Sequence, residues 1–281
     1  MNTEAKLRSL RTSSLVVTIF AALLLAVGVA QLGLGAMAVS EEYDRIEELE
    51  QLTRQSTYYG YQAQQAAVQA EYNRSGSRFF AEGRFLSGSD ELTWSDPSAI
   101  AFLALVAAAL GFFIAAMIWV WRAHANIIEA GVRAKYTPGK ALAAYLLPVA
   151  NLIFPFEAMR ELHNRSHGEP EDFAHSSVED VTAWWTAVIV GLLIFSAMIV
   201  KMTLDAGTNL ILMTPLWMEF AILAFAIVLL LVGALLFAGL TRRIAAAQAE
   251  FLPEIAANAD QLEEPARQSV RILGGEATEP Y

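Results

Sequence analysis

Four long apolar runs constrain this chain more than any other feature. They cover residues 14–39, 99–121, 181–202 and 216–240 of the 281-residue sequence. A helix needs about 20 mostly apolar residues to cross the hydrocarbon layer of a membrane, and each run supplies them. Because lipid offers no hydrogen bonds, a spanning segment must satisfy its own backbone, which favours helices. We therefore predict an all-α integral membrane protein with four transmembrane helices.

The tryptophans support the ends of these runs. All six lie near a run's end, at Trp94, Trp119, Trp121, Trp184, Trp185 and Trp217. Tryptophan prefers the headgroup region because its ring is apolar while its N–H needs a partner. The basic residues before the first run would also suit a cleaved signal peptide over residues 1–38. However, the apolar part of a signal peptide is usually only about 7–15 residues long, so we expect a retained helix.

Charge and motifs exclude several functions. The net charge of −10 gives no electrostatic support for binding nucleic acid. The chain has no cysteine, which excludes disulfides, thiol catalysis and cysteine–metal sites. The sequence also lacks a phosphate loop, a nucleophile elbow and a dinucleotide fingerprint. We expect no catalytic residues, cofactor or metal, and the lipid bilayer is the partner that the composition indicates.

The stretch "PGKALAAYLLPVANLIFPF", residues 138–156, is long enough to suggest a fifth span, yet it contains three prolines. Lysine and arginine accumulate on the cytoplasmic side of a membrane. If the stretch does not cross, 13 basic residues lie inside and 6 outside; if it crosses, 8 lie inside and 11 outside. The first arrangement follows the rule, so we predict a stretch that does not cross. Both termini then lie in the cytoplasm.

Prolines divide this stretch into two predicted helical pieces. Thr137 would cap the first piece, with Pro138 at its first position. Pro148 and Pro155 lack the N–H that a continuous helix needs, so we predict a break near Asn151. The second piece should be an amphipathic helix that runs to Ser166 and ends at Gly168 and Pro170, with Glu161 among the polar residues that lie mostly away from its apolar side. The result is a re-entrant or interfacial element.

The remaining segments complete the predicted topology. Residues 40–98 form an acidic extracytoplasmic loop that begins as a helical stalk and ends in an irregular return rich in glycine and serine. Residues 203–215 form a short outer loop. The cytoplasm would hold residues 1–13, the segment 122–180 with the broken element, and an acidic, partly disordered tail over 241–281.

Several polar residues are candidates for a site. Six of them could converge at the cytoplasmic mouth of the bundle: Arg122, Asn126, Asn151, Glu157, Arg160 and Glu161. His163 and His167 have a spacing that metal sites use, but we favour structural roles for both sets. We expect Glu219 to be solvated near the membrane surface, one turn from Trp217, and Gln31 to bond another helix. A small-residue face at Ala107, Gly111 and Ala115 suits bundle packing or contact with a second copy of the chain.

Residues 99–245 resemble a bacterial membrane-protein family, the domain of unknown function family 4328. The resemblance rests on "WR" at 121–122 followed by Asn126, "TPG" at 137–139, "PVANLIFP" at 148–155, "MREL" at 159–162 and "WW" at 184–185. Its motif positions are Arg122, Asn126, Pro138, Gly139, Pro148, Asn151, Leu152, Pro155, Arg160, Glu161, Leu162, Trp184 and Trp185. The resemblance implies a protein of the bacterial cytoplasmic membrane with four membrane helices, and it implies no particular reaction.

Three functions are compatible with these observations. We favour a non-enzymatic interaction, scaffold or sensor-type membrane protein, which would act through a homo-oligomer or a membrane or extracytoplasmic protein partner. A transporter or channel component could use the broken helix near Asn151. An enzyme acting on lipid headgroups could use Glu157, Arg160, Glu161 and His163, provided that these side chains meet within hydrogen-bond reach.

Overall fold

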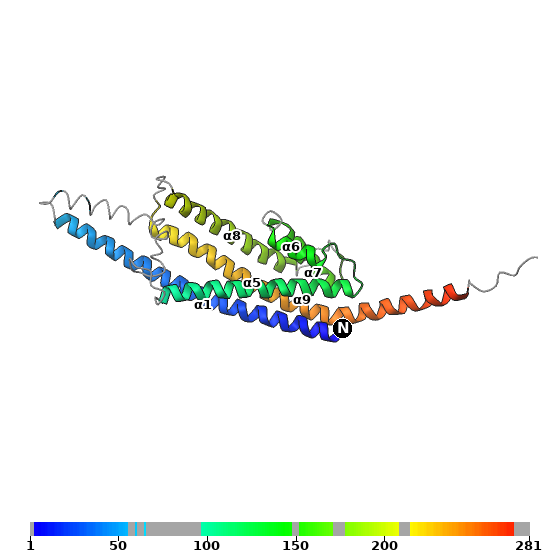
Figure 1. Cartoon of the computed structure of the whole chain (residues 1–281). Coiled ribbons are helices and arrows are strands. Elements are labelled where there is room, and N and C mark those ends of the chain that lie inside the picture. Colours follow the sequence, from blue (N-terminus) through cyan, green and yellow to red (C-terminus); the bar gives the residue numbers. More distant parts are fainter. Residues whose placement is uncertain are drawn as a thin grey trace, which may run out of the picture. The chain divides into compact units, whose positions relative to one another are not determined.

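Every element in the computed structural model is an α-helix (Figure 1). The structure describes residues 3–55, 60, 65, 97–147, 152–170, 178–207 and 214–272. Within them lie α1 (Thr3–Gln55), α5 (Pro97–Glu129), α6 (Pro138–Leu146), α7 (Phe154–Ser166), α8 (Val178–Gly207) and α9 (Leu216–Ile272). The predicted all-α class is confirmed.

Four of these helices are long and apolar enough to cross a membrane. They are α1, α5, α8 and α9, and each of the four apolar runs lies within one of them. α1 also continues beyond its apolar run to Gln55, so the first part of the predicted stalk is helical. The irregular return predicted before residue 97 lies outside the described residues.

The helix α9 is longer than the sequence suggested. It continues through Arg243 and Pro253 to Ile272, where a short helix followed by a partly disordered tail was predicted. Residues 273–281 lie outside the described part of the chain.

The proline-rich stretch forms two short helices, as predicted. Thr137 caps α6 by accepting a hydrogen bond from the Lys140 backbone N–H at 3.4 Å, and Pro138 occupies the first turn. α6 has nine residues and α7 has thirteen, so at about 1.5 Å per residue neither spans a hydrocarbon layer of about 30 Å. α6 and α7 pack against each other. Pro148 and Asn151 lie outside the described residues. The structure therefore shows the helices on either side of the predicted break but does not describe the break itself.

Contacts divide the chain into two units. Unit 1 contains Met1–Val17, Ala115–Thr182 and Ala238–Tyr281. Unit 2 contains Thr18–Ile114 and Ala183–Phe237. α6 and α7 belong wholly to unit 1, whereas the four long helices contribute residues to both units.

Aromatic rings and close helix contacts build the core of unit 2. The Phe237 ring lies 5.9 Å from that of Phe112 and 5.4 Å from that of Trp184, measured between ring centroids. At Gly111, a Cβ atom would overlap the ring of Phe20, so α1 and α5 can approach closely there because the residue is glycine. Bundle packing, one of the two roles considered for the small-residue face, is therefore confirmed at Gly111.

Two glycines end helices in unit 1. Gly131 has a φ of 83° and follows α5, while Gly168 has a φ of 74° and follows α7. After α5, the N–H of Val132 donates to Ile127 O and that of Gly131 to Ile128 O, which is the Schellman pattern. A β-carbon is disfavoured at such positive φ values, which explains both glycines. The predicted end of α7 at Gly168 is confirmed.

Candidate functional site

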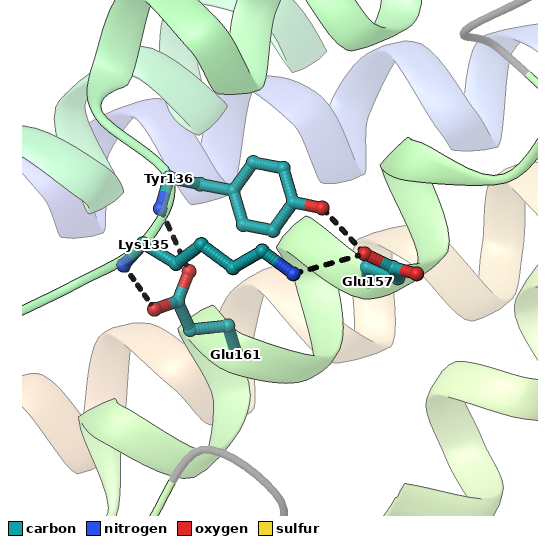
Figure 2. A network of polar contacts seen from close by, with 4 residues as sticks. All are labelled: Lys135, Tyr136, Glu157 and Glu161. Atoms are coloured by element: carbon teal, nitrogen blue, oxygen red, sulfur yellow. Dashed lines mark hydrogen bonds and ion pairs between the residues drawn. The ribbon is translucent and has the colours of Figure 1, made fainter.

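Two carboxylates of α7 hold the loop between α5 and α6 (Figure 2). Glu161 is 2% exposed. Its Oε1 accepts the backbone N–H of Lys135 at 2.5 Å, and its Oε2 accepts that of Tyr136 at 3.0 Å. Both oxygens of a buried charge are thus satisfied by loop amides, which offsets the cost of removing the carboxylate from water.

Glu157 holds the side chains of the same two loop residues. Its Oε2 accepts the Tyr136 hydroxyl at 2.6 Å and faces the Lys135 ammonium at 3.4 Å. The hydrogen bond from Tyr136, aided by the charge of Lys135, lowers the pKa of Glu157 below its ordinary value. We call Lys135, Tyr136, Glu157 and Glu161 the loop clamp.

The local sequence explains why the loop clamp forms. Glu157 and Glu161 are four residues apart, so they lie on one face of α7, one turn apart. The Schellman turn at Gly131 ends α5 and releases the chain four residues before Lys135. Backbone amides in the following loop lack helical partners, and Glu161 supplies acceptors for two of them.

A second polar cluster joins three helices. The side-chain amide of Gln248 in α9 donates to Ala123 O of α5 and to Ser166 Oγ of α7, both at 3.1 Å. Ser166 in turn donates to Leu162 O at 2.6 Å. Asn126 donates to Gln248 Oε1 at 3.4 Å. We call Asn126, Ser166 and Gln248 the glutamine junction.

Polar contacts also join the remaining segments of unit 1. Lys6 pairs with Glu129, and Arg243 pairs with Asp180. The Ser14 hydroxyl lies 3.1 Å from that of Thr241 and donates to it. Arg122 reaches the backbone carbonyl of Ser9 at 3.5 Å. These contacts connect α1 with α5 and α9, and α8 with α9.

The three described histidines do not form a metal cluster. The rings of His163 and His167 lie 4.4 Å apart, but His163 is 2% exposed and His167 Nδ1 is occupied by the carbonyl of His163 at 2.7 Å. His124 is also buried, and its Nδ1 bonds Val120 O within α5. Among the described residues, no three histidine or acidic side chains are grouped to hold a metal ion.

Unit 2 contains a buried ion pair that corrects one expectation. Glu219 was expected to be solvated near the membrane surface, but it is 1% exposed and lies 2.6 Å from the Lys201 ammonium. Thr214 donates a further hydrogen bond to the same carboxylate oxygen. Burial therefore makes Glu219 dependent on a partner in α8, because an isolated charge inside the bundle would be costly.

The scan against protein families matched residues 87–246 to one model, "Domain of unknown function (DUF4328)". The match covers more than half of the chain. The chain belongs to this family. Neither the curated proteins nor the solved structures gave a match.

Some DUF4328-like positions have clear structural roles. Pro138 starts α6, Pro155 lies in the first turn of α7, and Glu161 is part of the loop clamp. Leu162 is fully buried. Trp184 packs on Phe237, and the rings of Trp184 and Trp185 lie 5.2 Å apart. Gly139 lies beside the ring of Trp121. Arg160 is half-buried, whereas Leu152 is 51% exposed.

Four of the six polar residues considered for a single site divide among three partners. Arg122 bonds Ser9, and Asn126 bonds Gln248, whereas the two glutamates bond the loop. Asn151 lies outside the described residues. The prediction that Glu161 faces away from the buried side of α7 was wrong, because loop amides cover it.

Sequence reasoning missed Gln248 and Tyr136. A usable signal existed for Gln248, since it shares helical spacing with the buried Ile244 and Leu252 and so lies on an apolar face. A lone amide on such a face needs a hydrogen-bond partner from another helix. Tyr136 carried no comparable signal, because its partner depends on how the loop folds against α7.

Proposed function

We propose that this DUF4328 protein is a non-enzymatic multi-pass protein of the bacterial cytoplasmic membrane that acts by binding other proteins. Both termini would lie in the cytoplasm, and the α6–α7 element would be re-entrant or interfacial on that side. One observation carries the proposal: buried polar side chains of unit 1 hold helices and loops together. Glu161, Gln248 and Ser166 each use their hydrogen-bonding atoms within unit 1.

The geometry argues against the alternative of a lipid-headgroup enzyme. Glu161 and His163 are two positions apart on α7, which places them about 200° apart around the helix axis. Both are buried, each with 2% of its surface exposed. A general acid and base must reach the same reacting atoms, so these two residues do not form one site.

The extension of α1 beyond its apolar run is the surface proposed to bind a partner. Glu41, Asp44, Glu47 and Glu48 are exposed on this helical segment, whereas Ile46 is buried. Exposed charge on an ordered helix offers a rigid surface for a basic partner on the outer side of the membrane.

Site-specific crosslinking tests this role. A photoreactive residue placed at Glu47 in cells should give a discrete protein adduct, and the same residue at Ile19, an exposed position in the apolar run, should not. The change Glu48→Lys should weaken the adduct at Glu47, because it reverses a neighbouring charge.

Assays of the purified protein in liposomes test the two alternative functions, an enzyme and a transporter. Turnover of a lipid or peptide substrate that is lost in Glu157→Gln would overturn the proposal in favour of an enzyme. Solute or ion flux above that of empty liposomes would instead support the transport alternative near Asn151. Discrete crosslinks without turnover or flux support an interaction protein.

A further inference from the structure

The C-terminal end of α6 and the N-terminal end of α7 expose large apolar side chains. Five described residues at these two ends are 46–61% exposed: Leu146, Leu147, Leu152, Ile153 and Phe154. No charged residue occurs between Ala141 and Phe156. Exposing this much apolar surface to water is unfavourable, at about 25 cal/mol per Å². We call these five residues the hairpin tip.

The other end of α6 lies beside an interfacial tryptophan of a spanning helix. The ring of Trp121 is 4.0 Å from the position a Cβ atom would take on Gly139. Trp121 is 48% exposed, and Ile118, one turn earlier on α5, is 46% exposed. The apolar exposed side of α5 therefore leads directly to the start of α6, within one unit.

A cationic residue follows each of the two contacting residues in sequence. Arg122 follows Trp121 in α5, and Lys140 follows Gly139 in α6, and both side chains are exposed. Two carboxylates of unit 1 are already engaged with other lysines, Glu129 with Lys6 and Glu157 with Lys135. The surface thus combines positive charge with a tryptophan ring and aliphatic side chains, as an anionic phospholipid requires.

We propose that this surface binds an anionic phospholipid. Its phosphate would pair with Arg122 and Lys140, and its acyl chains would lie against Ile118, Trp121 and the hairpin tip. The proposal rests on the placement of this end of α5 in the cytoplasmic leaflet, as set out above. The proposal gives the α6–α7 element a ligand of a stated class. The exposed apolar residues would then be covered by acyl chains that are continuous with the lipid around α5.

Native mass spectrometry of protein extracted from bilayers of mixed phosphatidylglycerol and phosphatidylcholine tests the headgroup part. The intact protein should retain phosphatidylglycerol selectively. Each basic residue near a membrane surface contributes about fivefold to such binding, so Arg122→Gln with Lys140→Gln should weaken retention about 25-fold. Arg133→Gln, an exposed change in the loop after α5, should leave it unchanged, because we expect this position to lie in water. Equal retention of the two lipids, or selectivity that survives the double variant, would overturn the proposal.

A spin label tests the hairpin tip. The chain has no cysteine, so Ile153→Cys and Arg133→Cys each create one labelling position. In bilayers, the label at Ile153 should collide often with oxygen and rarely with a water-soluble nickel chelate, and the label at Arg133 should show the reverse. Equal access of nickel to both labels would refute insertion of the tip.

These outcomes are separate from those of the proposed function. Turnover of a substrate would refute the interaction role without changing lipid retention. Loss of lipid selectivity would refute the lipid site without affecting crosslinks at Glu47. Thermal unfolding of Lys140→Gln, Ile153→Cys and Arg133→Cys in detergent should match that of the unaltered protein, because these side chains are exposed. Arg122→Gln should lower the unfolding temperature only slightly, because it loses one exposed contact with the Ser9 carbonyl at 3.5 Å.

Discussion

The side chain of Gln248 in α9 donates a hydrogen bond to the backbone carbonyl of Ala123 in α5, at 3.1 Å. The same amide nitrogen donates to Ser166 in α7. Gln248 is fully buried, so water cannot replace either contact. One amide therefore links three helices of unit 1 that are far apart in sequence.

Replacing Gln248 with leucine should destabilise the protein by about 1–3 kcal/mol. The change removes two donated hydrogen bonds and leaves buried acceptors without them, which is the costly case for a polar group. Thermal unfolding in detergent, followed by tryptophan fluorescence, measures the loss. The exposed neighbour Glu250→Leu is the matched control and should change stability little. An unchanged unfolding temperature in Gln248→Leu would show that the glutamine junction does not support the fold.

Replacing Tyr136 with phenylalanine should raise the pKa of Glu157 toward its ordinary value of 4.5. The lost hydroxyl is the largest single cause of the lowered pKa, and Lys135 lowers it further through both its charge and its hydrogen bond. NMR titration of isotope-labelled glutamate follows this carboxyl directly. Lys135→Met should also raise the pKa of Glu157, and an unchanged pKa in Tyr136→Phe would contradict the assigned role of the hydroxyl.

The same contact should make the loop clamp sensitive to acid. A carboxyl whose pKa is lowered by folding contributes stability above its unfolded pKa and loses that contribution as pH falls through the folded pKa. The stability gap between the unaltered protein and Tyr136→Phe should therefore close as the pH falls below 4.5. Unfolding measured across acidic pH checks this, and a gap that widens toward low pH would contradict it.

Replacing Gly111 with leucine should destabilise unit 2, because the new side chain would occupy the place of the Phe20 ring. Overpacking of this kind costs about 1–3 kcal/mol. Gly33 lies in α1, where a Cβ atom would meet nothing within 4 Å, so Gly33→Leu is the matched control. Thermal unfolding of both variants in detergent separates crowding from the general effect of a glycine change. Similar behaviour of the two would show that α1 and α5 are not in close contact at Gly111.

Features that depend on residues close together in the chain could be predicted from the sequence. Features that depend on contacts between residues far apart in the chain could not. Hydropathy identified the four long helices because each run is apolar over its own length. Thr137 and Gly168 marked helix ends because capping is local. Glu161 was misplaced because the two amides that cover it belong to a loop 25 residues away or more. Helical periodicity alone counts such a carboxylate as solvent-facing.

Glu219 failed for a related reason. Its short distance from Trp217 along α9 indicates that Glu219 lies near a membrane surface. That position does not reveal which side chain Glu219 contacts. Lys201 lies in another helix, and only the packing of α8 with α9 within unit 2 brings its ammonium to 2.6 Å. Gln31 was likewise expected to bond another helix, yet its buried side-chain oxygen has no hydrogen-bond partner among the described residues.

Breaking the Lys201–Glu219 pair should cost more than removing both charges. Lys201→Met leaves the buried carboxylate without its cation, a situation that typically costs about 3–5 kcal/mol. The double variant Lys201→Met with Glu219→Leu removes both desolvation penalties and should recover much of the stability. Unfolding temperatures in detergent for the two single variants and the double variant form a complete cycle. Additive losses would contradict the pair, because independent residues do not compensate for each other.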